Sequence, residues 1–179
     1  MSKQIALWHA EHVNFARLLD MLEREVTEFS NGGRPNYDLM FDILFYLQTY
    51  SDRFHHPRED VAFARLVQRD PSLEVVVNRL LQEHRVIAVA GEELSKRLNE
   101  AVDDVANTRA VLEAAAATYL VYYRHHLDKE EGEIMPRAKE LLTGSDWAAV
   151  AQAMPEAYDP IAGGDIQATL RELRTRIAH

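Results

Sequence analysis

The chain has 179 residues, of which 47% are hydrophobic and 27% are charged, as is typical of one globular domain with a single core. The net charge of -9, without any basic block, argues against binding to a nucleic-acid backbone. The absence of cysteine excludes disulfides, iron–sulfur ligation and thiolate zinc sites. Because no apolar run could span a membrane and no secretory signal is visible, we expect a cytoplasmic protein without a membrane partner.

Four long amphipathic segments follow one another along the chain. In each, apolar residues recur at alternating spacings of three and four, which places them on one face of a helix. Turn signals such as Asn31-Gly32-Gly33 and Asp70-Pro71 separate the segments, and no strand signal is present. The predicted helices cover about residues 4–29, 36–66, 73–99 and 108–142. Short connections between such helices predict an all-α fold, an antiparallel up-down four-helix bundle.

The remaining part of the chain is expected to pack against one end of this bundle. A short helix is predicted at 146–154 and a final helix at about 165–178. No domain boundary is visible, so residues 1–179 are predicted to form one domain, with the bundle at about 4–142 and a C-terminal helical extension at about 145–179.

The two halves of the bundle repeat one another. A Glu-His pair at 11–12 recurs at 83–84, and the segment 52–63 aligns with 123–134 after a shift of one residue. The histidine of the first helix of each half is separated from that of the second by 43 residues in one half and 42 in the other. Each second helix adds a glutamate four residues after its histidine, on the same helical face. Packing the two halves face to face would therefore gather six side chains, which are His12, His55, Glu59, His84, His126 and Glu130.

This set of side chains predicts a dinuclear metal site. Imidazole is a good ligand for iron, copper, nickel and zinc, and a carboxylate can bridge two cations. Two acids buried beside four histidines would cost several kcal/mol of desolvation without such compensation, on the order of the penalty for other buried charges. Each histidine alone would be an ordinary core residue, and each His-Glu pair an exposed surface pair. The agreement between the two halves favours the metal site.

The order H…HxxxE…H…HxxxE resembles the hemerythrin-like (HHE cation-binding) domain family over about residues 5–140. The resemblance implies a non-haem diiron site with two iron ions (Fe2+/Fe3+) joined by an oxo or hydroxo bridge. It also implies that Glu59 and Glu130 bridge the ions, with His12 and His55 on one and the remaining pair, His84 and His126, on the other. The protein as isolated could instead carry another divalent metal, such as zinc.

The sequence departs from the oxygen-carrying members of that family at two positions. Ala88 stands where those proteins have a second histidine one turn after the third-helix ligand, and Glu130 replaces an aspartate found one residue later. These departures indicate a more open site, which favours binding or sensing of O2, NO or redox state, or iron handling, over reversible oxygen carriage. The alternatives are an enzyme that consumes peroxide or NO, an iron–sulfur-repair-type protein, or a bundle in which metal is only structural. A metal-binding or sensing protein is favoured over a dedicated enzyme, so no catalytic residue is assigned.

Several further polar residues lie near the predicted site. His9, Tyr119, Tyr122 and Glu131 are candidates for additional ligands or for partners of the ligands. Other histidines that neighbour the predicted ligands, His56 and His125, lie about 100° from the ligand stripe, so a surface or inter-helix contact is expected for them. Asp60 is expected to be solvated.

Two further expectations concern the helix around Pro57 and the partners of the chain. The helix is expected to continue through Pro57 with a local kink or bulge, because the matching segment 125–131 contains no proline. A small diatomic ligand, O2 or NO, is the expected partner, and the chain could be a monomer or a homodimer. A ferritin-like diiron site is excluded because no glutamate is followed by a histidine three residues later.

Overall fold

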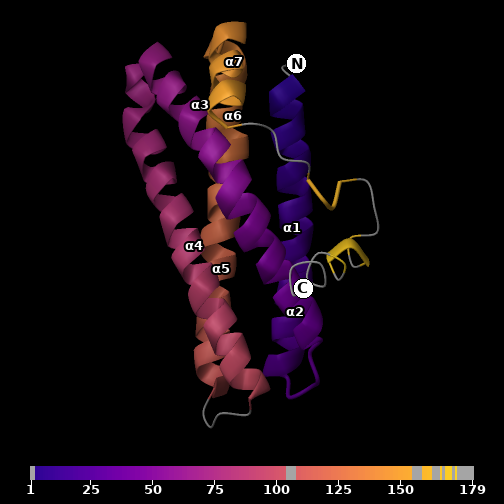
Figure 1. The fold of residues 1–179 in the computed structure, drawn as a ribbon. Helices are drawn as coiled ribbons and strands as arrows, with labels where there is room; N and C mark the ends of the chain where they lie inside the picture. The colour runs from indigo at the N-terminus through magenta and orange to yellow at the C-terminus, as the bar shows by residue number, and fades with distance from the viewer. Residues whose placement is uncertain are drawn as a thin grey trace.

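The computed structural model describes residues 3–103, 108–154, 159–162, 166, 168–170 and 172. These residues are largely helical, and no strand occurs among them (Figure 1). The first long helix is α1 (Lys3–Ser30) and the third is α4 (Glu74–Val102), which follows a short 3-10 turn, η2 (Pro71–Leu73). The second long helix is built from three consecutive pieces, α2 (Tyr37–Tyr46), η1 (Leu47–His55) and α3 (His56–Arg69). The fourth is built in the same way from α5 (Thr108–Lys129), η3 (Glu130–Ile134) and α6 (Met135–Leu141), and α7 (Gly144–Ala153) follows it.

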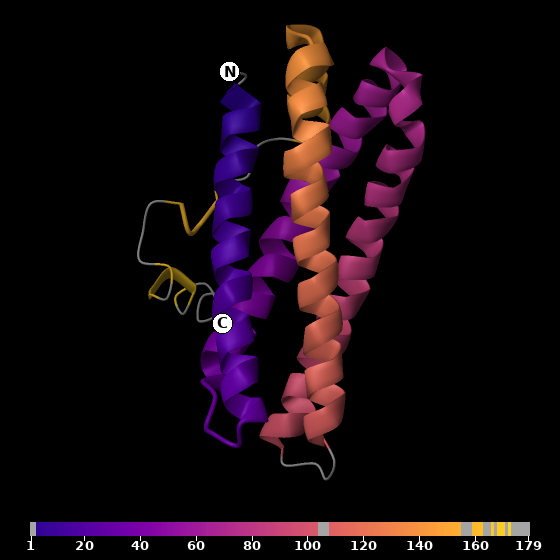
Figure 2. The same cartoon turned by 180° about the vertical axis from the view of Figure 1, so that it is seen from behind.

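The four long helices alternate in direction and lie side by side (Figures 1 and 2). This arrangement confirms the predicted all-α up-down bundle. The helix that follows the bundle, α7, packs beside α3 at the end of the bundle where α1 begins (Figure 1). The predicted short helix at 146–154 therefore exists as α7, whereas most of the predicted final helix at 165–178 lies outside the described residues.

Local side-chain chemistry fixes several helix ends. The side chain of Asn36 accepts a hydrogen bond from the backbone N–H of Leu39 at 3.0 Å and so caps the start of α2. Gly32 has a φ of 81° just beyond α1, a left-handed conformation that glycine adopts without a steric penalty. Thr143 and Asp146 form a reciprocal capping box at the start of α7.

Two π-helical segments interrupt the long helices beside the predicted ligands. The first, η1, ends at His55, and the second, η3, begins at Glu130. π-Helical turns are rare and often occur at functional sites. Pro57 lies in the first turn of α3, where its missing N–H costs little. The helix therefore continues through Pro57, and the π-helical segment before it is the local bulge that the sequence predicted.

The apolar core is divided into two clusters by a layer of polar side chains. One cluster contains Phe15, Leu47, Ile87 and Tyr123, and the other contains Trp8, Phe63, Leu80 and Ile134, with further members in each. On every long helix the predicted ligands come between residues of the two clusters. Burial of apolar side chains on both sides of the layer holds the four helices at this level of the bundle.

One of the two tyrosines named as candidate partners of the ligands faces outward. Tyr122 is 45% exposed, and the neighbouring residue Tyr123 is fully buried in its place. Both Tyr122 and Tyr123 precede His126 by about one turn, so helical spacing alone permits either one. Packing selects Tyr123, whose ring lies 6.3 Å from that of Phe15 on α1. Tyr122 therefore lies at the surface, and Tyr123 takes the buried position on this turn of the helix.

Candidate metal centre

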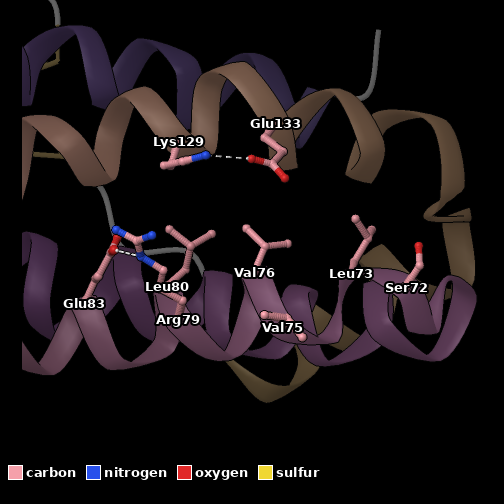
Figure 3. A pocket seen from close by; sticks show the side chains of 9 residues that line it. All are labelled: Ser72, Leu73, Val75, Val76, Arg79, Leu80, Glu83, Lys129 and Glu133. Carbon is pink, nitrogen blue, oxygen red and sulfur yellow. Dashed lines mark hydrogen bonds and ion pairs between the residues drawn. The ribbon is translucent and has the colours of Figure 1, made fainter.

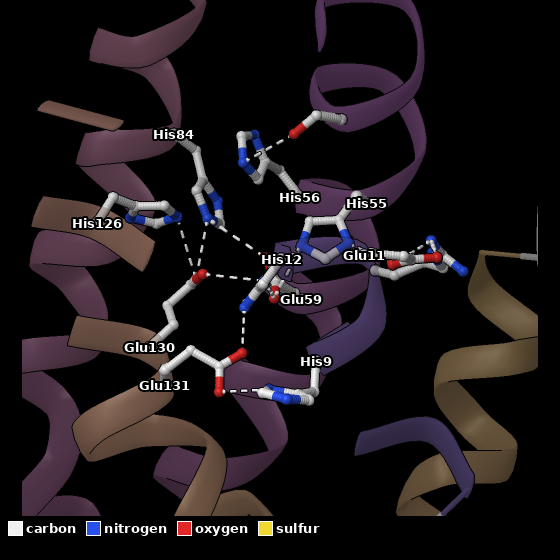
Figure 4. Close-up of polar contacts among 12 residues, drawn as sticks. His9, Glu11, His12, His55, His56, Glu59, His84, His126, Glu130 and Glu131 are labelled. Atoms are coloured by element: carbon white, nitrogen blue, oxygen red, sulfur yellow. Dashed lines mark hydrogen bonds and ion pairs between the residues drawn. The ribbon is translucent and has the colours of Figure 1, made fainter. Parts of the chain in front are cut away.

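All six predicted ligand residues meet in the polar layer (Figure 4). They come from four different helices, and the side chain of each is at most 6% exposed. His12 lies on α1, His84 on α4 and His126 on α5, and the remaining three lie at the junctions around η1 and η3. The described residues that could hold a metal form two overlapping groups, His12 with His55 and Glu59, and His56 with Glu59, His84 and His126.

The carboxylate of Glu59 connects the two pairs of histidines. Its Oε1 lies 3.4 Å from Nε2 of His12 and 3.2 Å from Nε2 of His55. Its Oε2 lies 3.7 Å from Nε2 of His84, in the other half of the bundle. Each oxygen of Glu59 therefore faces a different half of the internal repeat.

Glu130 makes the matching connection from the opposite side. Its Oε2 lies 3.5 Å from Nε2 of His12, and its Oε1 lies 3.5 Å from Nε2 of His84 and 3.2 Å from Nε2 of His126. Nε2 of His12 lies 2.9 Å from Nε2 of His55. Two donors at right angles around one ion, each about 2.1 Å from it, would be about 3 Å apart. The spacing of these atoms therefore suits cation binding among the histidines and the two carboxylates.

A carboxylate lies at the outer nitrogen of each of the four histidines, and two of these carboxylates come from the repeated Glu-His pair. Oε2 of Glu11 lies 2.6 Å from Nδ1 of His55, and Oε2 of Glu83 lies 3.3 Å from Nδ1 of His126. Such a contact holds a proton on Nδ1 and turns Nε2 toward the layer, where it would bind a metal after losing any proton of its own. Each glutamate thus orients a histidine of the neighbouring helix rather than the one beside it in sequence.

The other two carboxylates follow the predicted glutamate ligands directly in sequence. Oδ1 of Asp60 lies 2.7 Å from Nδ1 of His84, and Oε1 of Glu131 lies 2.8 Å from Nδ1 of His12. The second oxygen of Glu131 lies 2.9 Å from Nδ1 of His9. Asp60 is therefore not simply solvated, although its side chain is 47% exposed. Glu131 and His9 occupy the supporting positions that the sequence allowed for them.

His56 was placed by its sequence position at the surface or at an inter-helix contact. The structure excludes the surface, because His56 is only 3% exposed and its ring stacks on that of His84 with 4.2 Å between the centroids. His125 is exposed, with Nε2 3.0 Å from a guanidinium nitrogen of Arg79. Tyr119 is fully buried in the apolar cluster below the layer, and its hydroxyl has no hydrogen-bond partner among the described residues.

The six predicted ligand residues, called the cage from here on, hold opposite charges close together. Burial alone would lower the pKa of His12 and of His84, but the carboxylates around them outweigh burial and raise each pKa to about 10. Burial alone would raise the pKa of Glu59, and the nearby imidazolium of His55 reverses this and holds that pKa well below its ordinary value. For His56, burial and then the nearby charges of His84 and His126 lower the pKa, which keeps its imidazole neutral.

The inner atoms of the cage lack ordinary hydrogen bonds. Both oxygens of Glu59, both oxygens of Glu130 and Nε2 of His84 and of His126 are buried without a hydrogen-bond partner in the described structure. Buried polar atoms are normally satisfied, and leaving one unsatisfied costs on the order of 1–3 kcal/mol. Cations between these atoms would satisfy all of them. The donor set therefore fits a metal centre.

The comparison with known families bears directly on this fit. The description "Hemerythrin HHE cation binding domain" belongs to a family model that matches residues 3–138, most of the chain. The chain belongs to the hemerythrin HHE cation-binding domain family. The match covers every residue of the cage and its carboxylate partners, so cation binding is the function of this bundle. No curated protein and no solved structure matches the chain significantly.

A surface pocket of about 310 Å³ opens between α4 and the α5–η3 helix of this hemerythrin-family bundle (Figure 3). Glu83 lines the pocket and also contacts His126. Arg79 pairs with Glu83 along one wall, and Lys129 pairs with Glu133 along the other (Figure 3). The pocket brings solvent close to one of the four supporting carboxylates.

In the described part of the chain, no helix has the length and apolar character that crossing a membrane requires.

Loss of Glu11 is expected to destabilise the metal-free bundle far more than loss of Glu83. Glu11 is the ion-pair partner of Arg58, whose side chain is 1% exposed, so Glu11→Ala would leave a buried guanidinium charge uncompensated and cost about 3–5 kcal/mol. Arg79, the partner of Glu83, is 61% exposed and would be hydrated, so Glu83→Ala should cost about 1 kcal/mol. Urea unfolding of both variants without metal measures the difference. Equal losses of stability would contradict this account.

Proposed function

We propose that this chain holds two metal ions, iron in the cell, between its two histidine pairs, and uses them to bind or sense O2, NO or redox state, or to handle iron. The observation that carries the proposal is the placement of Glu59 and Glu130. Each presents one oxygen to the His12 side of the cage and the other to the His84 side. A site for one ion would not need two carboxylates that each face both sides.

Each residue of the cage would have a distinct role in holding the two ions. His12 and His55 would hold one ion, His84 and His126 the other, and the two glutamates would bridge them and offset their charge. Iron would supply a change of oxidation state and an affinity for small diatomic molecules. The carboxylates at the outer nitrogens would keep the imidazoles oriented and raise their basicity.

A second candidate function is turnover of peroxide or NO at the same site. It is favoured by Ala88, which provides no donor one turn after His84 and so leaves room for a substrate at the metal. Steady-state assays with each substrate separate the two functions. Sustained consumption would support an enzyme, whereas binding of one equivalent and no more would support a sensor or binding protein.

Metal content and optical spectra test the proposal as a whole. The protein, purified from iron-supplemented cells without oxygen and then exposed to air, is expected to contain two irons per chain. It should also develop ligand-to-metal charge-transfer absorption in the near-ultraviolet and visible range upon exposure. A protein that contains less than one metal per chain and shows no such absorption would rule out the proposal.

Metal binding is expected to become tighter as the pH rises. His12 and His84 have pKa values of about 10 in the metal-free protein, so both carry protons at pH 7 that a metal must displace. Each proton released makes the apparent affinity about tenfold higher per pH unit below that pKa. Anaerobic Fe2+ titrations at pH 6.5 and 7.5 measure the change. An affinity that does not depend on pH would show that these histidines are not protonated or are not ligands.

A further inference from the structure

Five buried imidazoles, rather than four, surround the polar layer. The fifth belongs to His56, whose ring lies parallel to that of His84, with an interplanar angle of 9°, and edge-on to that of His126 at 5.5 Å (Figure 4). One ring nitrogen of His56 lies within 4.8 Å of donor atoms of Glu59, His84 and His126. That distance is close to the separation of about 4.2 Å between donors on opposite sides of one ion with bonds of about 2.1 Å.

His56 shares one feature with the four predicted histidine ligands, a carboxylate near Nδ1, although that carboxylate lies on its own helix and its Oδ1 makes no hydrogen bond among the described residues. Each of those four has a carboxylate at Nδ1, and Oδ1 of Asp52 lies 3.3 Å from Nδ1 of His56. Nε2 of His56 has one contact, at 3.2 Å from the hydroxyl of Ser51. That hydroxyl lies closer to the phenol of Tyr123, at 2.5 Å. A metal would therefore compete for Nε2 of His56 with a single long hydrogen bond.

The internal repeat gives His56 no counterpart. When His55 is matched with His126, residue 56 is matched with Leu127, which belongs to the apolar cluster. Ala88, one turn after His84, also lacks a donor atom. His56 therefore places an imidazole beside His84 and His126, whereas its counterpart in the repeat, Leu127, carries no donor atom.

We propose that His56 is a ligand of the metal held by His84 and His126, and that it makes the two metal positions unequal. This inference rests on the proposed function, because it assigns a further donor at the same centre. One ion would have three imidazole donors and the other two, with Glu59 and Glu130 shared between them. The ion with fewer protein donors keeps more positions for a small molecule.

Anaerobic titration of the full chain with Fe2+ alone, followed by metal analysis and Mössbauer spectroscopy, tests the assignment. His56→Leu copies the residue at the equivalent position of the repeat, and His125→Leu is the matched control on the exposed neighbour of His126. The native protein should bind two irons with distinct spectra. In His56→Leu one of the two sites should weaken at least tenfold and its spectrum should change, while His125→Leu should resemble the native protein.

A rescue experiment separates ligation from packing. In His56→Gly, free imidazole added to the buffer should restore the weakened site, whereas a packing role alone would give no dependence of metal binding on imidazole. Two unaltered sites in His56→Leu, with native spectra, would overturn the assignment of His56 while leaving the proposed function intact. A native chain that binds no iron would overturn both.

Discussion

Glu59→Gln is expected to reduce binding from two metal ions per chain to one or none, with an affinity at least about 100-fold lower. Both oxygens of Glu59 face imidazole nitrogens, one toward His12 and His55 and the other toward His84. Glutamine has nearly the same shape, but it carries no charge and its NH2 group cannot bind a cation. Loss of a partner that only orients a ligand already costs 10–100-fold in affinity, so loss of a bridging ligand should cost more.

The control for this change is an exposed glutamate of the fourth long helix. Glu133→Gln alters a glutamate that pairs with Lys129 at 3.0 Å on the surface, outside the cage. Metal-to-protein ratios after desalting, with circular dichroism to confirm the helical fold, compare the two variants. If Glu59→Gln retained two metals as tightly as Glu133→Gln, Glu59 would not bridge them.

The repeat predicted which residues would meet because the two halves of the chain give independent signals that agree. His55 with Glu59 and His126 with Glu130 are each weak signals, since helices produce such pairs by chance. Their agreement across the two halves, together with His12 and His84 on the partner helices, required one shared polar layer. The bundle fold followed from the same periodicity, because four amphipathic helices with short connections have few ways to bury their apolar faces.

The four supporting carboxylates could not be assigned from the sequence alone, although the sequence contains a signal for them. Glu11 and Glu83 precede a ligand in both halves, and Asp60 and Glu131 follow one in both halves. Each, however, contacts a histidine of a different helix. Only the rotation and spacing of the packed helices decide which histidine that is, and sequence periodicity does not specify them.

Of the two positions predicted for His56, the inter-helix contact is correct and the surface is not, because this helix has more than one buried face. A straight α-helix turns by about 100° from one residue to the next, so His55 and His56 cannot point in the same direction. The helix that carries them lies between two neighbours at this level. His55 contacts Glu11 on α1, and His56 stacks on His84 on α4, so both directions lead into the interior.

Removal of the metals by a chelator is expected to lower the melting temperature by about 10 °C or more without unfolding the chain at room temperature. A ligand at 1,000 times its dissociation constant stabilises the folded state by about 4 kcal/mol for each site. For a domain of this size, about 1 kcal/mol corresponds to about 2–4 °C. The metal-free chain should stay folded because the apolar clusters on either side of the layer remain intact and the histidines keep their carboxylate partners. Differential scanning calorimetry before and after chelation measures the shift.

The difference in melting temperature between the two forms should widen between pH 6 and pH 8. In the metal-free protein the pKa of His12 and of His84 is raised from 6.5 to about 10, so the stability from their protonated pairs is complete below pH 6.5 and is lost as the pH rises toward 10. The pKa of Glu59 is lowered from 4.5, so its contribution is present above that pH and is lost in acid. Bound metal displaces the protons of these histidines and binds more tightly as the proton concentration in solution falls. The metal-free form should therefore lose stability across this range while the metal-bound form does not. A difference that narrowed between pH 6 and pH 8 would mean that something other than proton displacement at these histidines couples the metal to folding.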